Sequence, residues 1–213
     1  MKIEIACETD IVLVDIIGFS KLDPLEQLEI IKYMTNSYIN MVNKMLEKSN
    51  MIVDDFIEGY IPTGDGFFCI LNPKMKGYGT VLGLNFSYLS SFISKKYQYF
   101  QGVKVAVHTG EIYQFKDMLG HKNYIGDGLN DCSRYLEVKH FAGSTVMISY
   151  EAYQNLREFL ILNGDFNQLF IKHGFKYSTM QEFKDKHLKV KKGCLVWLRD
   201  SGIMNLPIKE RDD

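Results

Sequence analysis

The alternation of apolar and polar side chains along the chain predicts a sheet combined with long helices. Residues 10–19, DIVLVDIIGF, form a nearly continuous apolar and β-branched run, which predicts a buried strand that Asp15 interrupts with a single inner carboxylate. Apolar side chains then recur at helical spacing from residue 25 to residue 45, with Asp23 placed as an N-cap and Pro24 as the first helical residue. The chain is therefore predicted to open with a strand followed by a long helix.

A hairpin is predicted next, because two strand-like runs, at 52–61 and 66–71, flank the turn-rich segment PTGDG, with Asp65 at or near the tip. The further predicted elements are a helix near 79–97, a strand at 103–110 with extended residues at 111–115, a polar loop at 117–123, a helix that follows Gly126 and Asp127, a strand at 144–148, a helix near 150–159, and strands in the C-terminal third. This order, βαββαβ with additions, predicts an α+β fold, a ferredoxin-like palm in which helices cover one face of a mainly antiparallel sheet.

Composition narrows the class of protein. The 213 residues, 46% hydrophobic and 24% charged, suffice for one core, and neither a repeat nor a linker divides them, so we expect a single domain over residues 1–200 and a short tail over 201–213. A formal charge of −1 provides no basic surplus to attract a nucleic acid polymer or an anionic membrane. The acidic N-terminus and the lack of a long apolar run favour a cytoplasmic location. The four cysteines lack metal-binding spacing and are expected to be reduced thiols.

Two aspartates are candidates for metal binding. A carboxylate inside an apolar strand, as at Asp15, needs a hydrogen bond, an ion pair or a metal ion to offset its desolvation. If the hairpin strand neighbours the first strand, Asp65 stands beside Asp15, and Mg²⁺ or Mn²⁺ would relieve the repulsion between them while binding phosphate oxygens. The alternatives are a structural, hydrogen-bonded role for Asp15 and a simple turn role for Asp65.

Two further segments have polar groups suited to a nucleotide. Residues 16–20 supply consecutive backbone amides between a strand and a helix, and Gly18 permits close approach of a triphosphate, although the same residues also make an ordinary turn. Asn130 and Arg134 are four residues apart and share one helix face, where an amide and a guanidinium suit the orientation of a ribose and the stabilisation of phosphoryl charge. Their alternative role is an exposed polar face.

Taken in order, VDIIGFS, TGDGFF, VAVHTGEI and YIGDGLNDCSR resemble the blocks of the class III adenylate and guanylate cyclase catalytic domain. The resemblance spans most of residues 10–139 and implies the class III cyclase fold with two divalent metal ions, Mg²⁺ or Mn²⁺. It implies metal binding by Asp15, Ile16 and Asp65, phosphate binding by Ile17, Gly18, Phe19, Ser20 and either Lys191 or Lys192, and catalysis by Asn130 and Arg134. It also implies a homodimer with two composite sites, in which the metal aspartates of one protomer face the Asn and Arg of the other.

The sequence departs from the family at the positions that read the base. Ile61 stands where adenylate cyclases have a lysine and guanylate cyclases a glutamate, and Asn123 occupies the partner position. Ile61 cannot hydrogen-bond a purine, the bulky Tyr60 beside it would shrink the pocket, and the Asn123 amide can both donate to and accept from a pyrimidine. The pattern favours UTP or CTP and resembles the stand-alone pyrimidine cyclases of bacterial antiphage signalling, which make cUMP or cCMP for a separate effector.

Three other functions compete with this interpretation. An adenylate cyclase with an unusual base pocket is the main alternative. A diguanylate cyclase is disfavoured because TGDGF lacks the consecutive acidic pair of that signature. A non-catalytic, nucleotide-binding cyclase-like module would usually lack a metal aspartate, and this chain has both.

Overall fold

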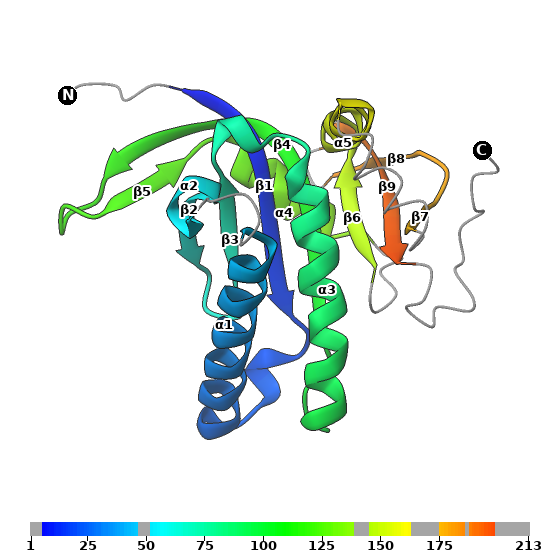
Figure 1. The fold of residues 1–213 in the computed structure, drawn as a ribbon. Coiled ribbons are helices and arrows are strands. Elements are labelled where there is room, and N and C mark those ends of the chain that lie inside the picture. Colours follow the sequence, from blue (N-terminus) through cyan, green and yellow to red (C-terminus); the bar gives the residue numbers. More distant parts are fainter. Residues whose placement is uncertain (1–5, 47–51, 139–144, 163–174, 186–187, 199–213) are drawn as a thin grey trace.

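The computed structural model of the chain describes residues 6–46, 52–138, 145–162, 175–185 and 188–198 (Figure 1). The strands are Cys7–Ile16 (β1), Ile57–Pro62 (β2), Gly66–Leu71 (β3), Val103–Lys116 (β4), Lys122–Ile125 (β5), Val146–Ser149 (β6), Phe175–Tyr177 (β7), Gln181–Lys184 (β8) and Val190–Leu198 (β9). The α-helices are Pro24–Leu46 (α1), Val53–Phe56 (α2), Tyr78–Lys96 (α3), Asp127–Leu136 (α4) and Tyr150–Leu162 (α5), and short 3₁₀ turns occupy Phe19–Lys21 and Pro73–Met75.

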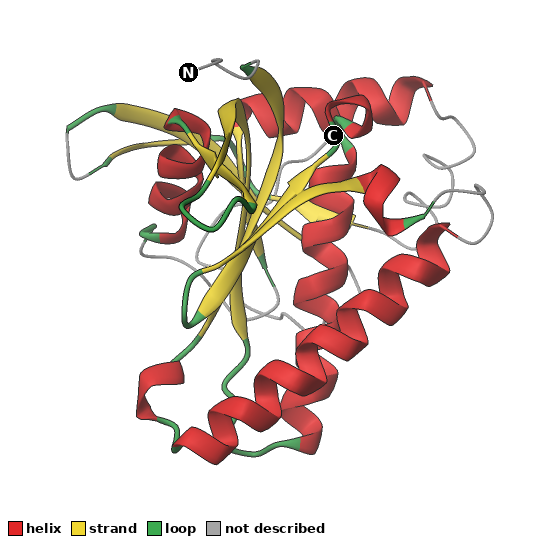
Figure 2. Cartoon of the chain, turned by 90° about the vertical axis from the view of Figure 1, so that its left-hand side faces the viewer, coloured by secondary structure: helices red, strands yellow, loops and turns green. Residues whose placement is uncertain are grey.

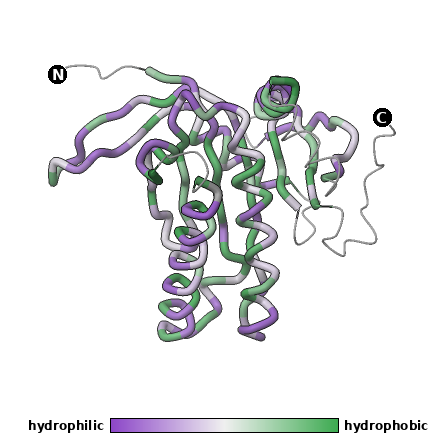
Figure 3. The backbone as a smooth tube through the Cα atoms, viewed as in Figure 1, coloured by the Kyte–Doolittle hydropathy of each residue, from purple (hydrophilic) through white to green (hydrophobic). Residues whose placement is uncertain are grey.

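The sheet has the order β2-β3-β1-β4-β6-β9-β7, with β5 added to β4 and β8 added to β9. The described strand pairs are antiparallel, except that β4 and β6 run parallel. This arrangement confirms the predicted α+β fold with a mainly antiparallel sheet. β1 lies inside the sheet between β3 and β4 and is covered on both faces, which explains its continuous apolar run (Figure 3).

Helices cover both faces of the sheet, which corrects the expectation that they cover one. Alternate residues of β1 point to opposite faces, so Val12 and Val14 belong to the core beneath α1 and α3, whereas Ile11 and Leu13 belong to the core beneath α4. α1 and α3 lie side by side over the first face (Figures 1 and 2). We refer below to the two sides of the sheet as the α1–α3 face and the α4 face.

The start of α1 follows the predicted chemistry. Oδ1 of Asp23 accepts hydrogen bonds from the amides of Leu25 (2.8 Å) and Glu26 (2.9 Å), and the Glu26 carboxylate accepts one from the Asp23 amide (3.1 Å). This reciprocal capping box satisfies amides that an uncapped helix would leave without partners. The buried stripe of the helix repeats at helical spacing: Ile30, Met34, Tyr38, Val42 and Leu46.

Three local expectations were wrong. β1 ends at Ile16 and does not run to residue 19, because Gly18 adopts a left-handed conformation (φ 70°) that turns the chain out of the sheet. The predicted strand from residue 52 begins as the short helix α2. The expected polar loop at 117–123 contains the start of β5, which pairs with the second half of a 14-residue β4. Among the residues that pair in this hairpin Tyr124 alone is buried, so hydrophobic alternation does not reveal the hairpin.

Asp10 is the most deeply buried carboxylate of β1, and its role is structural. Its Oδ2 accepts hydrogen bonds from the amides of Gly77 (2.7 Å) and Gly79 (3.0 Å) at the start of α3, and its Oδ1 accepts one from the Thr109 hydroxyl (2.6 Å). Burial raises the pKa of Asp10, and these hydrogen bonds oppose the shift.

Within the described ranges, no helix combines the length and the apolar character needed to cross a membrane.

Candidate active site

Asp15 and Asp65 meet where β1 leaves the sheet. Asp15 is in register with Gly66 of β3, and the amide of Ile16 donates a 2.8 Å hydrogen bond to the carbonyl oxygen of Asp65. The pKa of Asp15 is raised to about 6, first by burial and then by the charge of Asp65 and a side-chain hydrogen bond with it. Two carboxylates 50 residues apart in the sequence therefore repel each other at one edge of the sheet.

This pair fits hard divalent cations. Mg²⁺ in enzymes is commonly held by one or two carboxylates together with substrate phosphates, so a full cage of protein ligands is not needed. In the described part of the chain, no cluster of three or more His, Cys, Asp or Glu side chains could form such a cage. The two carboxylates thus offer an open site of oxygen ligands, to which Ile16 would add its backbone carbonyl.

Lys104 adds a cation beside this pair, and sequence reasoning missed it. Lys104 on β4 is in register with Asp15 on the same face of the sheet, and its charge lowers the pKa of Asp15, against the effects of burial and Asp65. The only sequence signal was a charged residue in the otherwise apolar run VKVAVHTG. The position of Lys104 beside Asp15 becomes apparent only from the strand pairing.

The loop after β1 presents backbone amides next to the carboxylate pair. The amide of Ile17 is used in a 3.0 Å hydrogen bond to the carbonyl of Gly102, so Ile17 contributes less to an anion site than expected. The amides of Gly18, Phe19 and Ser20 make no hydrogen bond with the described part of the chain. These three donors, beside two carboxylates and a lysine, are suited to phosphate oxygens accompanied by cations.

α4 positions Asn130 and Arg134 on the opposite side of the sheet from α1 and α3. The start of the helix can lie close to β4 because Gly126 has no Cβ. A Cβ at this position would come within 2.6 Å of the carbonyl oxygen of Glu111. Asn130 is exposed, and the side chain of Arg134 is mostly buried. Nη1 of Arg134 lies 2.6 Å from Oδ1 of Asp131 and 3.3 Å from Oδ2 of Asp185.

The structure brings Lys191, and not Lys192, together with Arg134. Neighbouring residues of a strand point to opposite faces, and Lys191 Nζ lies 2.5 Å from Oδ2 of Asp131 on the α4 face. Lys192 instead lies 3.6 Å from Glu182 and over the ring of Tyr150. Asp131 and Asp185 were missed in the sequence because each looks like an ordinary surface or turn carboxylate.

The three expected base-reading residues do not all come together. Ile61 packs on the α4 face in register with Phe68, on the same side of the sheet as Asp15. Tyr60 points to the α1–α3 face, where it stacks on Phe67 with ring centroids 5.0 Å apart. It therefore does not narrow a pocket beside Ile61, because successive side chains of a strand alternate between faces.

Asn123 lies on β5, with its side-chain carbonyl already engaged. Oδ1 of Asn123 accepts a 2.8 Å hydrogen bond from the amide of Tyr124. The hydroxyl of Tyr124 in turn donates to the carbonyl of Glu58 on β2 (2.7 Å), and Lys122 pairs with the Glu58 carboxylate. Because a backbone N–H bonds only to an acceptor, the Asn123 amide has a defined orientation.

The Asp15–Asp65 pair and the Arg134–Lys191 pair lie far apart in one chain. Strand register places Ile11 of β1 and Gly193 of β9 at the same level of the sheet. Asp15 lies four residues beyond that level in one direction, and Lys191 lies two residues beyond it in the other. At about 3.3 Å per residue the separation along the strands alone is roughly 20 Å. The two groups cannot act on one phosphate within a single protomer.

Comparison with known proteins identifies the fold. No protein-family model matches the chain, and no curated protein matches its sequence. Among solved structures, the guanylate cyclase domain of RhGC from Catenaria anguillulae in complex with GTP is similar over 92% of this chain and 100% of that one, with 13% identity and a TM-score of 0.59. This chain has the fold of a nucleotide cyclase domain.

Two other cyclases have the same fold. The guanylyl cyclase Cya2 is similar over 96% of this chain and 99% of its own, with 13% identity and a TM-score of 0.60. The adenylate/guanylate cyclase/hydrolase from Silicibacter pomeroyi is similar over 92% and 99%, with 14% identity and a TM-score of 0.57. At such identities the likeness concerns the fold, and the chemistry must be argued from the site.

Proposed function

We propose that the chain is a nucleotidyl cyclase that converts a nucleoside triphosphate to its 3′,5′-cyclic monophosphate and pyrophosphate. The observation that carries the proposal is the repelling Asp15–Asp65 pair, beside free loop amides and Lys104, in the fold of cyclase domains. A site with two carboxylates and several phosphate donors suits a substrate that combines divalent cations with a triphosphate.

Each part of the site has a role in this reaction. Asp15, Asp65 and the Ile16 carbonyl would hold two divalent cations, Mg²⁺ or Mn²⁺, which supply positive charge that acidifies the ribose 3′-hydroxyl and binds the triphosphate. Lys104 and the amides of Gly18, Phe19 and Ser20 bind phosphate oxygens. The 3′-oxygen forms a bond to the α-phosphorus, the bond from that phosphorus to the β-phosphate oxygen breaks, pyrophosphate leaves, and the hydroxyl proton passes to water.

Asn130, Arg134 and Lys191 act on the same substrate from a second copy of the chain. Asn130 orients the ribose, and Arg134 neutralises the charge that develops on the α-phosphoryl group. Lys191 binds the triphosphate chain. The separation of roughly 20 Å along the strands supports this division, because two protomers related by a two-fold axis bring each half of the site to the other half twice.

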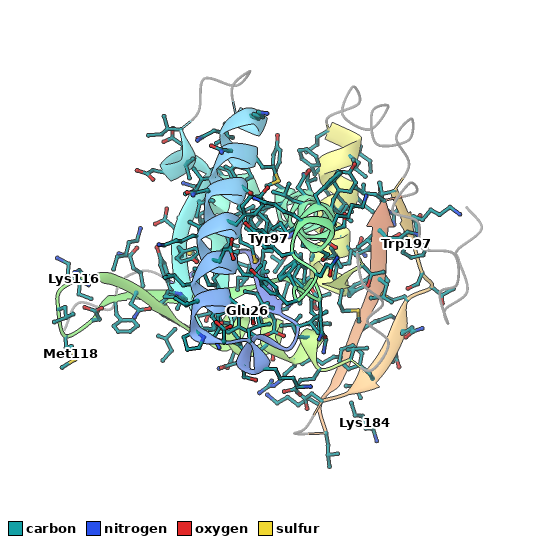
Figure 4. All side chains as sticks on the ribbon, turned by 90° about the horizontal axis from the view of Figure 1, so that it is seen from below. Glu26, Tyr97, Lys116, Met118, Lys184 and Trp197 are labelled. Atoms are coloured by element: carbon teal, nitrogen blue, oxygen red, sulfur yellow. The ribbon has the colours of Figure 1, made fainter. Side chains whose placement is uncertain are left out.

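The β4–β5 hairpin supports the homodimer as well. It forms an arm that projects from the body of the molecule, with the labelled Lys116 and Met118 lying out on it (Figure 4). Met118 is 97% exposed and Leu119 is 74% exposed, and Ile125 on the returning strand is exposed too. Exposed apolar side chains gathered on a projecting hairpin favour a partner that covers them, and a second protomer is the partner that the divided site requires.

The substrate that we propose is a pyrimidine nucleotide. The apolar pair of Ile61 and Phe68 offers no hydrogen bond to a purine edge. Because the Tyr124 amide holds the Asn123 oxygen against the backbone, the NH₂ group on the other side of the amide is the donor that Asn123 offers. A donor matches O4 of uracil and opposes the amino groups of cytosine and adenine. We therefore favour UTP over CTP and ATP, with cUMP as a second messenger for a separate effector, as the resemblance to antiphage cyclases implies.

The test is to incubate the purified chain with Mn²⁺ and each of ATP, GTP, CTP and UTP separately, and to identify products by chromatography and mass. cUMP, absent in an Asp65→Ala control, is the expected result. Cyclic AMP or GMP alone would leave the cyclase assignment standing and overturn the pyrimidine specificity. No cyclic product from any nucleotide would favour a non-catalytic nucleotide-binding module.

A further inference from the structure

Two cations and two carboxylates form a compact cluster where α4 meets the turn between β8 and β9. The cluster is Arg134 and Asp131 from α4, Lys191 from β9, and Asp185 from the turn. The two oxygens of Asp131 are divided between the cations, with Oδ1 at 2.6 Å from Arg134 Nη1 and Oδ2 at 2.5 Å from Lys191 Nζ. Asp131 is therefore a bridge between the two cations.

The cluster is shielded enough for this bridge to matter. The side chains of Arg134 and Lys191 are each 14% exposed, and that of Asp185 is fully buried. Two cations held this close in a site with little water repel each other strongly, and an anion placed between them offsets that repulsion. An exposed ion pair would hold its partners only weakly, whereas a mostly buried one restricts both side chains.

The contacts also orient the guanidinium of Arg134. Asp131 and Asp185 both approach Nη1. The contact of Arg134 with each carboxylate is therefore through Nη1. Nε and Nη2 are the two nitrogens that bind a phosphate through two parallel hydrogen bonds. The carboxylates thus bind Arg134 at Nη1, which lies outside the Nε–Nη2 edge that suits a phosphate.

We propose that Asp131 is a positioning residue, which holds Arg134 and Lys191 at a fixed spacing so that both act on one triphosphate. The proposal rests on the proposed cyclase function for its catalytic meaning. Asp131 does not contact the reacting atoms, and it acts through the two cations that do. By holding the two cations, Asp131 improves the geometry of the transition state. Its negative charge also lies close to the phosphates and lowers the affinity for the substrate.

These two effects change kcat and KM differently, and loss of folding would not produce the same combination. In Asp131→Asn the bridge loses its charge, and we expect kcat to fall by about 10- to 100-fold. KM for the nucleotide should stay the same or decrease, because a repelling charge has been removed. Asp131→Glu, which keeps the charge on a longer side chain, should restore part of kcat. Glu182→Gln is the matched control, because it removes the exposed carboxylate beside Lys192 and should leave both constants unchanged.

A second measurement does not depend on catalysis. The chain has four arginines, so the Nε–H signals can be followed by ¹⁵N NMR and that of Arg134 assigned with Arg134→Lys. The Arg134 signal should indicate a rigid side chain in the wild-type protein and in Glu182→Gln, and a mobile one in Asp131→Asn. Unchanged rigidity, or an unchanged kcat in an active enzyme, would overturn the proposal. Absence of cyclic product in the wild-type protein alone would overturn the cyclase function, and the NMR result would still decide the positioning role.

Discussion

Arg134 stabilises charge on the phosphoryl group in the proposed chemistry, and a change to lysine tests the shape of its side chain separately from its charge. Arg134→Lys keeps a cation opposite the buried Asp185, so the fold should be retained. It removes the planar fork that spans two phosphate oxygens. We expect kcat to fall by about 100-fold with a small change in KM, measured by steady-state product formation. An unchanged kcat would remove Arg134 from this role.

Asn123 tests the choice of base at the same scale. Asn123→Asp replaces the amide donor by a carboxylate that only accepts hydrogen bonds. The ratio of kcat/KM for UTP to that for CTP should therefore fall at least about tenfold, because the amino group of cytosine can now donate to the side chain. Competition between the two nucleotides in one reaction measures this ratio directly. A ratio equal to that of the wild-type enzyme would mean that Asn123 does not face the base.

His108 makes the stability of the protein depend on pH. Burial lowers the pKa of His108 from its ordinary value of 6.5, and the Glu151 carboxylate, 3.7 Å from Nδ1, opposes the shift. The unfolded chain binds a proton at His108 more readily than the folded chain does. The stability that neutral His108 contributes is therefore complete above pH 6.5, and it is lost as the pH falls through the lower pKa of the folded state.

A variant that cannot take up this proton should lose less stability in acid. The free energy of unfolding of His108→Asn should decrease less than that of the wild-type protein between about pH 7 and about pH 5. Urea titrations followed by the fluorescence of the buried Trp197 measure it. Asp15, with a pKa of about 6, contributes with the opposite sign, and its contribution cancels in the comparison. Parallel pH profiles would contradict the prediction.

At the scale of elements, the β4–β5 arm decides whether the chain associates. Replacing both Met118 and Leu119 by aspartate places two charges on an arm that we expect a second protomer to cover. The double variant should sediment as a monomer and lose cyclase activity, while its far-UV circular dichroism stays unchanged. The same replacements at Ile161 and Leu162, two exposed apolar residues of α5, should leave the dimer intact. A dimeric arm variant would show that the interface lies elsewhere.

At the scale of the whole molecule, the divided site predicts complementation between inactive chains. Asp65→Ala damages the metal half of the site and Arg134→Lys the other half. When the two variants are mixed in equal amounts, dissociated and allowed to reassociate, half of the dimers are heterodimers. Each heterodimer has one intact site and one doubly damaged site. The mixture should recover about a quarter of wild-type activity for the same total protein. A mixture no more active than its components would contradict the composite site.

Much of this protein is determined by the sequence alone, wherever the deciding physics is local. The apolar run of β1, the capping of α1 by Asp23 and the hairpin around Asp65 are properties of neighbouring residues, and each is present in the structure. The α+β order follows from these elements. Asp15 became a candidate because a carboxylate in an apolar strand needs compensation, whereas Asn130 and Arg134 became candidates through the resemblance to the cyclase blocks.

Tertiary structure decided which residues meet. Strand pairing placed Asp15 beside Asp65 and Lys104, and the alternation of side chains put Lys191 with Arg134 and turned Tyr60 away from Ile61. Sequence patterns leave these outcomes open, because a shift of one residue in register exchanges the two faces of a strand. Asp131 and Asp185 gained their roles in the same way, since a carboxylate positions a cation only when the fold brings the two together.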